Sequence, residues 1–319
     1  MAQAAREAVE RETGRLFSDL WHRYDDAQYK HSVELFRQRW LANGEPEDFF
    51  GGKRCLDVGC GGGRYTIAMA RMGASEAVGV DLGEAGLEDA RARARALGIE
   101  NVRFQGASAL ELPFPDASFD FVCCSGVLHH TVGVERGLRE IRRVLRPGGG
   151  LYILLYGAGG LYWPLNLVMR PFAAALGKDE VERCLAAAGL PAAKQRTVLD
   201  DLFVPVLETY TRERVDHLLR EAGFADARWW GGGQLDHESD PATLIEELRQ
   251  REALWRAGAA SAPSPELARQ VARLADLCGA TVAAAEELAA EHAAGRLAAA
   301  GLREAVVGHG HHRVVARAA

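Results

Sequence analysis

Short apolar segments alternate with amphipathic ones between Lys53 and Tyr156, and this alternation predicts a parallel β-sheet with helices on both faces. An apolar segment of about four to eight residues is typical of a strand that is buried on both sides. The strands predicted in this way are Cys55–Val58, Ala77–Val80, Asn101–Gln105, Phe119–Ser125 and Gly150–Tyr156. The helices predicted between them are Tyr65–Ala70, Ala85–Leu97 and Val134–Leu145. The pattern therefore indicates a doubly wound α/β fold.

Residues 1–50 carry apolar positions at helical spacing and predict an amphipathic helical arm. These positions are Leu16, Leu20 and Tyr24, then Val33, Phe36 and Trp40. Packing of the arm on the domain behind it accounts for the leucine and phenylalanine positions. A denser polar-aromatic cluster, which fits either a substrate site or a solvated face, consists of Tyr24, Asp25, Asp26, Tyr29 and His31.

The alternation stops after Tyr156, and we interpret the residues that follow as a cap inserted after the fifth strand. A helix over Thr211–Ala222, with Thr211 as its N-cap, and a strand over Ala227–Trp230 resume the core pattern. Helices are predicted again over 240–303, and Arg313–Arg317 looks like one more strand. We therefore expect a helical N-terminal arm or lid (1–50), a core (51–157), a cap insertion (158–210), a core helix and strand (211–235), a helical insertion (236–305) and a C-terminal core strand (306–319).

Residues with chemical potential gather at the carboxyl ends of the predicted strands, where open α/β sheets bind their ligands. The first strand runs through Asp57 into the turn Gly59-Cys60-Gly61-Gly62-Gly63, and glycine lets a ligand approach bare backbone. Asp81 ends the second strand, about twenty residues after the glycines, where a carboxylate can accept both hydrogen bonds of a ribose diol. The third and fourth strands end in Ala107-Ser108-Ala109 and Ser125-Gly126-Val127-Leu128-His129-His130.

A nicotinamide dinucleotide site is the main rival explanation of such a glycine turn. The GxGxxG pattern of that site requires its third glycine where Arg64 stands. The nicotinamide interpretation also leaves the segments LPFPDASFD and RVLRPGG unexplained. The spacing therefore disfavours it.

Five motifs follow one another in the chain: LDVGCGGG, VGVD, LELPFPDASFDFV, SGVLHH and EIRRVLRPGGGLYI. Through this ordered set the chain resembles the class I S-adenosylmethionine-dependent methyltransferases, with a core like that of the ubiquinone and menaquinone methyltransferases. The resemblance covers residues 50–157 closely and Thr211–Trp230 more loosely. It implies S-adenosyl-L-methionine as the cofactor and a Rossmann-like sheet of seven strands whose last strand is antiparallel.

The resemblance also implies which residues line the cofactor site: Asp57, Gly59, Cys60, Gly61, Gly63, Asp81, Leu82, Ser108, Ala109, Ser125 and Val127. The glycine turn would shape the pocket for the methionine half, Asp81 would hold the ribose hydroxyls, and Leu82 would flank the adenine. Ser125 and Val127 would border the reactive methyl group. The family often has an acidic residue after the third strand that bonds the adenine amine, and Ser108 stands there instead, with Ala109 offering a backbone N–H.

Methyl transfer from a sulfonium depends mainly on alignment of the acceptor and exclusion of water, and a base matters only if the acceptor arrives protonated. His129 and His130 are the candidates near the methyl group, because imidazole can take up a proton near neutral pH. Packing at the strand end is the alternative role for either histidine. Asp201 of the predicted cap and Tyr29 of the predicted arm are two further candidates. The candidate catalytic residues are therefore His130, His129, Asp201 and Tyr29.

Asp200 and Asp201 stand among aromatic residues in the cap, and such a set could hold a cationic or amine-bearing substrate. The alternative is that Asp200 caps a helix and Trp163 packs beneath the cap.

Composition narrows the choice of partners. The formal net charge of −6 and the isoelectric point near 6.0 give no basic footprint for nucleic acid. No apolar segment approaches the length of a membrane span, and the polar N-terminus is no secretory signal, so we expect a cytoplasmic protein. The six cysteines include no CxxC pair, which argues against a disulfide framework or a zinc site. We expect no metal, because the C-terminal histidines lack partner ligands: His309, His311 and His312.

The sequence thus predicts a methyltransferase that uses S-adenosylmethionine to methylate a small-molecule metabolite by direct in-line displacement. An amine-bearing or cationic acceptor is one option. A protein or tRNA substrate, and a non-catalytic subunit that binds S-adenosylmethionine, are the alternatives. The acceptor atom and a homodimeric assembly stay open at this stage.

Overall fold

The computed structural model describes residues 3–21, 26–231 and 240–319. Within it the chain forms two compact units. Unit 1 consists of Met1–Tyr156, Pro205–Leu235 and His312–Ala319, and unit 2 consists of Gly157–Val204 and Asp236–His311. Tyr24 and Asp25 of the predicted polar-aromatic cluster lie outside the described residues.

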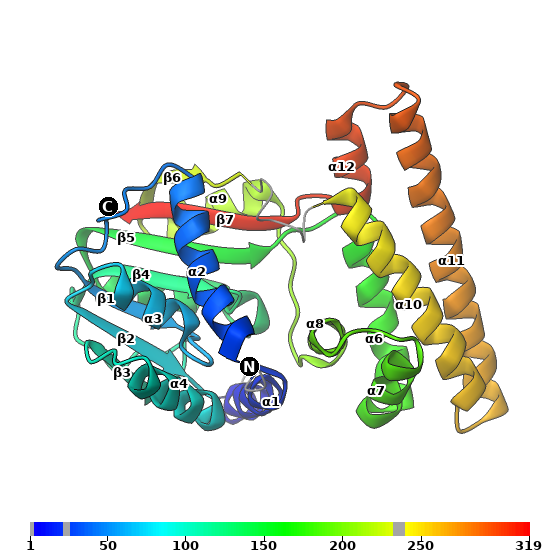
Figure 1. Ribbon diagram of the computed structural model, residues 1–319, viewed down its shortest axis with the longest axis horizontal. Coiled ribbons are helices and arrows are strands. Elements are labelled where there is room, and N and C mark those ends of the chain that lie inside the picture. Colours follow the sequence, from blue (N-terminus) through cyan, green and yellow to red (C-terminus); the bar gives the residue numbers. More distant parts are fainter. Residues whose placement is uncertain (1–2, 22–25, 232–239) are drawn as a thin grey trace. The chain divides into compact units, whose positions relative to one another are not determined.

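Unit 1 is built on a seven-stranded sheet with the strand order β3-β2-β1-β4-β5-β7-β6 (Figure 1). Its strands are β1 (Arg54–Val58), β2 (Glu76–Asp81), β3 (Val102–Gly106), β4 (Phe119–Ser125), β5 (Leu145–Tyr156), β6 (Phe224–Trp229) and β7 (His311–Ala318). The pairs among β1 to β5 are parallel, and β7 pairs with β6 in the antiparallel sense. The expected fold class, including the antiparallel last strand, is confirmed.

Alternating strand residues supply two separate cores, one for each face of this sheet. Leu56, Val122 and Ile153 pack in one core with helices α5 (Val134–Val144) and α9 (Arg212–Glu221). Cys55, Phe121 and Tyr152 pack in the other with α2 (Asp26–Ala42) and α3 (Arg64–Arg71). The helices of unit 1 also include α1 (Gln3–Trp21), α4 (Glu84–Ala96) and the short 3₁₀ helix η1 (Leu128–His130).

The helical arm contributes to the second of these cores. Val33, Phe36 and Trp40 of α2 are all buried, together with Tyr29. Trp40 makes edge-to-face contacts with Phe121 and Trp230, at ring-centroid distances of 5.6 and 5.3 Å. Helix α2 therefore belongs to the core of unit 1 through the positions that the helical spacing predicts.

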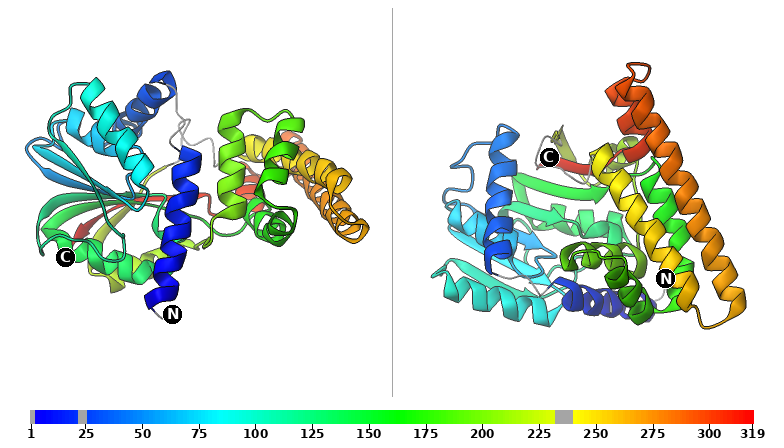
Figure 2. Two further views of the ribbon diagram at one scale, coloured as in Figure 1. Left: turned by 90° about the horizontal axis from the view of Figure 1, so that it is seen from below. Right: turned by 45° about the vertical axis from the view of Figure 1, so that its right-hand side comes forward.

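Unit 2 is helical. Its helices are α6 (Tyr162–Leu176), α7 (Lys178–Ala187), α8 (Ala192–Phe203), α10 (Pro241–Ser261), α11 (Pro265–Ala293) and α12 (Ala299–Val307). Helices α10 and α11 lie side by side and are joined by a short turn (Figure 2). Each of these two begins with a side-chain cap: Asp240 accepts from the backbone N–H of Thr243, and Ser264 accepts from that of Leu267.

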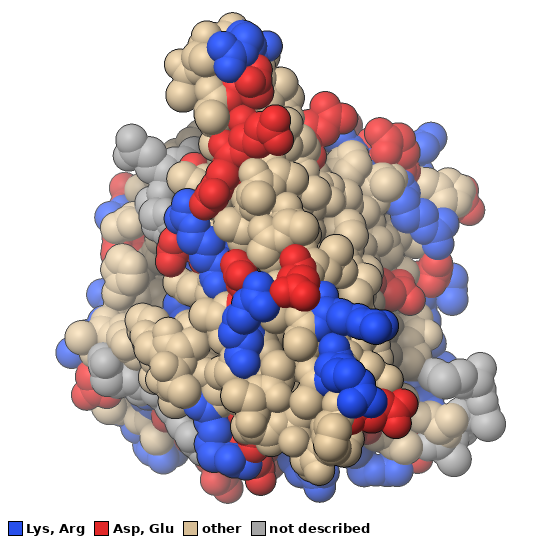
Figure 3. Space-filling model, turned by 90° about the vertical axis from the view of Figure 1, so that its right-hand side faces the viewer, with Lys and Arg blue, Asp and Glu red and all other residues tan. Residues whose placement is uncertain are grey.

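Acidic and basic side chains are interspersed on the side of the molecule that Figure 3 shows. Ion pairs join α10 to α11, where Arg249 contacts Glu286 at 2.6 Å and Arg256 contacts Asp276 at 2.8 Å. No helix among the described residues is long and apolar enough to cross a membrane.

Candidate active site

The glycine turn between β1 and α3 combines close packing with open space. Gly59, Gly61 and Gly63 all have positive φ, at 71°, 50° and 76°. A Cβ atom at Gly59 would lie 2.3 Å from Cγ2 of Val127, so only glycine fits there. A Cβ atom at Gly61 would meet nothing within 4 Å, so the turn presents bare backbone to an open space at this position. The turn therefore fits a ligand that lies against the backbone, as the cofactor would.

Asp81 at the end of β2 is held by this turn. Its Oδ2 accepts from the backbone N–H of Gly61 and its Oδ1 from that of Gly83, each at 2.8 Å. Burial raises the pKa of Asp81, and these backbone hydrogen bonds oppose the rise. A carboxylate has about four acceptor positions, so two bonds leave capacity for a diol. The acceptor positions left on Asp81 therefore fit the ribose hydroxyls of the cofactor.

Asp57 lies inside the protein at the end of β1. It is only 2 % exposed, and its Oδ2 accepts from the hydroxyl of Thr66 in α3 at 2.7 Å. Burial raises the pKa of Asp57 to about 6, and the Thr66 hydrogen bond opposes that rise. Cys60, in the glycine turn, is buried as well. Asp57 is thus a buried carboxyl that ties β1 to the first turn of α3.

Tyr29 reaches the same turn from α2. Its hydroxyl donates to the carbonyl oxygen of Gly62 at 2.7 Å, and the guanidinium of Arg93 lies 4.1 Å from its ring centroid. Burial raises the pKa of Tyr29, so the phenol keeps its proton at neutral pH. Tyr29 thus links α2 to the glycine turn by a hydrogen bond. Its catalytic role stays a prediction. Asp26 and His31 of the same cluster are exposed.

Helix α1 lies against three of the predicted site residues. Glu10 Oε1 accepts from the Ser108 hydroxyl at 2.8 Å. A Cβ atom at Gly14 would lie 3.0 Å from the Cβ of Leu82, whose side chain is 44 % exposed. The ring of Phe17 lies 5.2 Å from that of His130, between centroids.

Sequence reasoning did not identify Glu10, Gly14 and Phe17 as site residues. Their spacing of four and then three residues places them on one helical face, and this was the available signal.

The two histidines occupy η1, directly after β4. His129 is fully buried, and its ring lies 3.9 Å from that of Tyr156 and 4.1 Å from that of His130, between centroids. His130 is 3 % exposed, and its Nδ1 lies 3.0 Å from the carbonyl oxygen of Val206. A carbonyl oxygen only accepts, so we assign the proton of the neutral ring to Nδ1. Nε2 of His130 is then the nitrogen that can accept a proton.

The remaining predicted cofactor residues of unit 1 lie on the same edge of the sheet. Ser125 ends β4 and is paired with Leu154 of β5. Val127 packs against Gly59, and Ala109 is buried beside Ser108. Unit 1 thus brings the glycine turn, Asp81, the ends of β3 and β4 and both histidines to the carboxyl edge of one sheet.

Asp201 belongs to unit 2, where it is part of a buried polar cluster. Its Oδ2 accepts from the Arg251 guanidinium and from the Tyr162 hydroxyl, each at 3.0 Å. Arg251 is 1 % exposed and also donates to Asn166. Burial raises the pKa of Asp201 to about 6, and the positive charge of Arg251 opposes that rise. These bonds give Asp201 a structural role, and its catalytic role stays a prediction.

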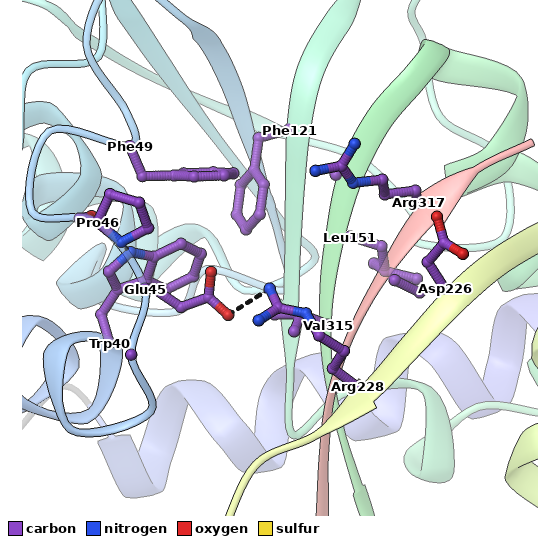
Figure 4. Close-up of a pocket in the computed structure, with 13 residues that line it drawn as sticks. Trp40, Glu45, Pro46, Phe49, Phe121, Leu151, Asp226, Arg228, Val315 and Arg317 are labelled. Atoms are coloured by element: carbon purple, nitrogen blue, oxygen red, sulfur yellow. Dashed lines mark hydrogen bonds and ion pairs between the residues drawn. The ribbon is translucent and has the colours of Figure 1, made fainter.

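A separate pocket of about 450 Å³ opens in unit 1, lined by Phe121 of β4 and by Gly150 and Leu151 of β5. Phe49 and Phe121 form part of its wall, and the buried carboxylate of Glu45 contacts Arg228 at 2.6 Å (Figure 4). None of the predicted site residues lines this pocket. The described residues contain no cluster of three or more His, Cys, Asp or Glu side chains suited to a metal ion.

Comparison with known proteins gives one family match and several similar proteins. Residues 56–153 match the family model described as "Methyltransferase domain". The uncharacterized methyltransferase YcgJ of Bacillus subtilis is 42% identical over 96 residues, which are 30% of this chain and 38% of that protein. The crystal structure of YcgJ covers 90% of this chain and is itself covered to 96%, with a TM-score of 0.43 and 19% identity.

Two further relatives carry names that state a reaction. The 27-O-demethylrifamycin SV methyltransferase of Amycolatopsis mediterranei is 37% identical over 147 residues, 44% of this chain and 54% of the relative. A ubiquinone biosynthesis O-methyltransferase of Azoarcus sp. is 31% identical over 191 residues, 54% of this chain and 80% of the relative. The chain thus spans less than two thirds of YcgJ and of the Amycolatopsis protein by sequence, and four fifths of the Azoarcus protein.

Proposed function

Because this chain belongs to the class I S-adenosylmethionine-dependent methyltransferases, we propose that it methylates a hydroxyl oxygen of a small molecule, with His130 as the general base. S-adenosyl-L-methionine is the methyl donor of the family. When bound, it supplies a methyl group that its sulfonium has already activated. The protein's task is then to align the acceptor, exclude water and take up the proton that the acceptor loses.

The observation that carries the proposal is the hydrogen bond between His130 Nδ1 and the Val206 carbonyl. It leaves Nε2 as the basic nitrogen of the neutral ring, and the packing of His129 and Tyr156 around His130 holds the ring in place. A hydroxyl acceptor must lose its proton as the new bond forms, so it benefits from such a base. The two relatives with named reactions are both O-methyltransferases, which supports the choice of oxygen.

The hypothesis of an amine-bearing or cationic acceptor rests on Asp200 and Asp201. Arg251 already supplies a positive charge to Asp201 at 3.0 Å, which weakens the support for that hypothesis. The hydroxyl proposal therefore takes precedence, and amines enter the test as competing substrates.

A substrate panel tests the proposal directly. The protein would be incubated with S-adenosylmethionine and a set of phenols, catechols and aliphatic amines, and the release of S-adenosylhomocysteine would be measured. We expect turnover with hydroxylated aromatic compounds. His130→Gln should lower kcat about 100-fold, a typical value for loss of a general base, and should leave the Kd of S-adenosylhomocysteine unchanged.

His217→Gln serves as the matched control, because His217 is an exposed histidine on α9. Its kcat should equal that of the wild-type protein. Turnover with amines alone, or a His130→Gln variant that keeps full kcat across the pH range, would rule out His130 as the base for a hydroxyl acceptor.

A further inference from the structure

Helix α1 brings a carboxylate to the end of β3, where Ser108 stands. The Ser108 hydroxyl accepts from the backbone N–H of Leu110 at 3.0 Å and donates its single proton to Glu10 Oε1 at 2.8 Å. The partners are 98 positions apart in the sequence, so the contact depends on the docking of α1. The serine therefore fixes the direction of the Glu10 carboxylate.

Glu10 is half-buried, and its Oε2 makes no hydrogen bond with the described part of the chain. The carboxylate lies beside residues that border the adenine in the expected mode of cofactor binding. Leu82 lies under Gly14, one helical turn from Glu10, and Ala109 follows Ser108 directly. An ionised carboxylate only accepts hydrogen bonds, and the exocyclic amine of adenine donates them.

We propose that Glu10 recognises the adenine of S-adenosylmethionine in the site that binds this methyl donor (the donor site). Glu10 accepts a hydrogen bond from the adenine amine, and Ser108 holds the Glu10 carboxylate in position. This inference rests on the proposed function, since it assumes that the donor binds at this edge of the sheet. It assigns to α1 the carboxylate that the chain lacks after β3. It also makes the N-terminal helix part of the donor site.

The other contacts of α1 fit this assignment. Arg6, one turn before Glu10, lies 3.5 Å from Glu111, and Phe17 lies against His130. The helix is therefore docked on both sides of Glu10, on residues that follow β3 and β4. A carboxylate supported in this way loses little side-chain freedom when it binds the amine, which favours discrimination between bases.

The experiment compares two ligands whose bases differ at the amine position and at the adjacent ring nitrogen N1. S-adenosylhomocysteine carries the amine and an N1 without a proton, whereas S-inosylhomocysteine carries a carbonyl oxygen that would face the carboxylate and a proton on N1. The N1 difference is common to all variants, so the readout is the change in the ratio of the two Kd values on mutation. Isothermal titration would give both Kd values for the wild-type protein, Glu10→Gln, Glu10→Ala and Ser108→Ala. We expect the wild-type protein to prefer the adenine ligand by at least 10-fold, the worth of a hydrogen bond to a charged group.

Glu10→Gln should reduce this ratio by at least 3-fold relative to the wild-type protein, because a glutamine amide can turn its NH₂ group toward the carbonyl oxygen. Glu10→Ala should reduce the ratio by weakening adenine binding alone. Ser108→Ala should produce a smaller loss, because the carboxylate remains but is no longer aligned.

Glu12→Gln, at an exposed position of the same helix, is the control and should keep the wild-type ratio. A wild-type preference that survives in Glu10→Gln and Glu10→Ala would overturn the inference, and so would its complete loss in Ser108→Ala alone. Failure of the wild-type protein to bind either ligand would instead contradict the proposed function. The two failures are therefore distinguishable.

Discussion

Asp57 shows how a single residue of the site influences stability. Its carboxyl is buried, with a pKa of about 6 in the folded protein against about 3.9 in an unfolded chain. Between these two values the folded state binds more protons than the unfolded state. The contribution of Asp57 to the free energy of unfolding therefore falls as the pH rises from about 4 to 6.

Asp57→Asn should remove this pH dependence, because the amide oxygen can still accept from Thr66 and no charge is buried. Relative to the wild-type protein, the free energy of unfolding of the variant should rise by up to about 3 kcal/mol between pH 4 and pH 7. Urea unfolding curves at several pH values would measure it. A difference that stays constant over this range would show that Asp57 is not the group responsible.

At the residue scale, the sequence identified those site residues that local position determines. Asp57 and Asp81 end strands, and the glycines follow a strand directly, so their place at the sheet edge follows from the strand pattern. Glu10 and Val206 could not be identified in this way. Their partners, Ser108 and His130, lie 98 and 76 positions away, and only the docking of other segments brings them together.

Helix α1 is the element whose docking most affects the site. Glycine in a helix interior costs up to about 1 kcal/mol relative to alanine, so a packing reason for Gly14 is expected. That reason is visible in the structure, where the missing Cβ lets the helix approach Leu82. The face that carries Glu10 and Phe17 is thereby brought close to β3 and η1.

Gly14→Leu should push α1 away from Leu82 and weaken binding of S-adenosylhomocysteine by about 10-fold or more, in keeping with the loss of the Glu10 hydrogen bond. Isothermal titration would measure the Kd. Ala8→Leu adds the same side chain at an exposed position of α1 and should bind as the wild-type protein does. Equal affinity in both variants would mean that donor binding does not require the docked helix.

The strands of unit 1 were predictable because each is a continuous apolar segment. The predicted strand Phe119–Ser125 coincides with β4, and the remaining boundaries shift by a few residues. The largest shift is at β5, which begins at Leu145 rather than Gly150 and pairs with Phe119 across a β-bulge. Pro147 and the glycines after it lie within this irregularity, where Gly148 has a φ of 73°, and regular pairing with β4 resumes at Gly150.

At the scale of the whole molecule, the chain leaves unit 1 twice and returns to it twice. The returning segments are fastened within unit 1: Tyr210 donates its backbone N–H to the Tyr156 carbonyl, and Nε2 of His312 lies 2.7 Å from the Tyr210 carbonyl. Unit 2 has its own buried cluster around Arg251. We therefore expect the two units to respond separately to a core mutation.

Arg251→Ala tests this expectation. It leaves the buried charge of Asp201 uncompensated, so it should destabilise unit 2 by about 3 to 5 kcal/mol, and thermal unfolding should show an earlier separate transition. The Kd of S-adenosylhomocysteine at 20 °C should stay within 2-fold of the wild-type value. Arg256→Ala removes exposed ion pairs instead and should cost less than about 1 kcal/mol. Loss of S-adenosylhomocysteine binding together with the unfolding of unit 2 would contradict the expectation that the two units respond separately.

The position of β7 has a consequence for folding during synthesis. Strand β6 stands at the edge of the sheet and has β7 as its one neighbour, yet roughly eighty residues of unit 2 are translated between them. At typical ribosome speeds this gap lasts on the order of ten seconds. During that time β6 has no neighbouring strand to pair with, while α10, α11 and α12 leave the ribosome exit tunnel. The strand that closes the sheet of unit 1 is therefore made only after the helices of unit 2 are complete.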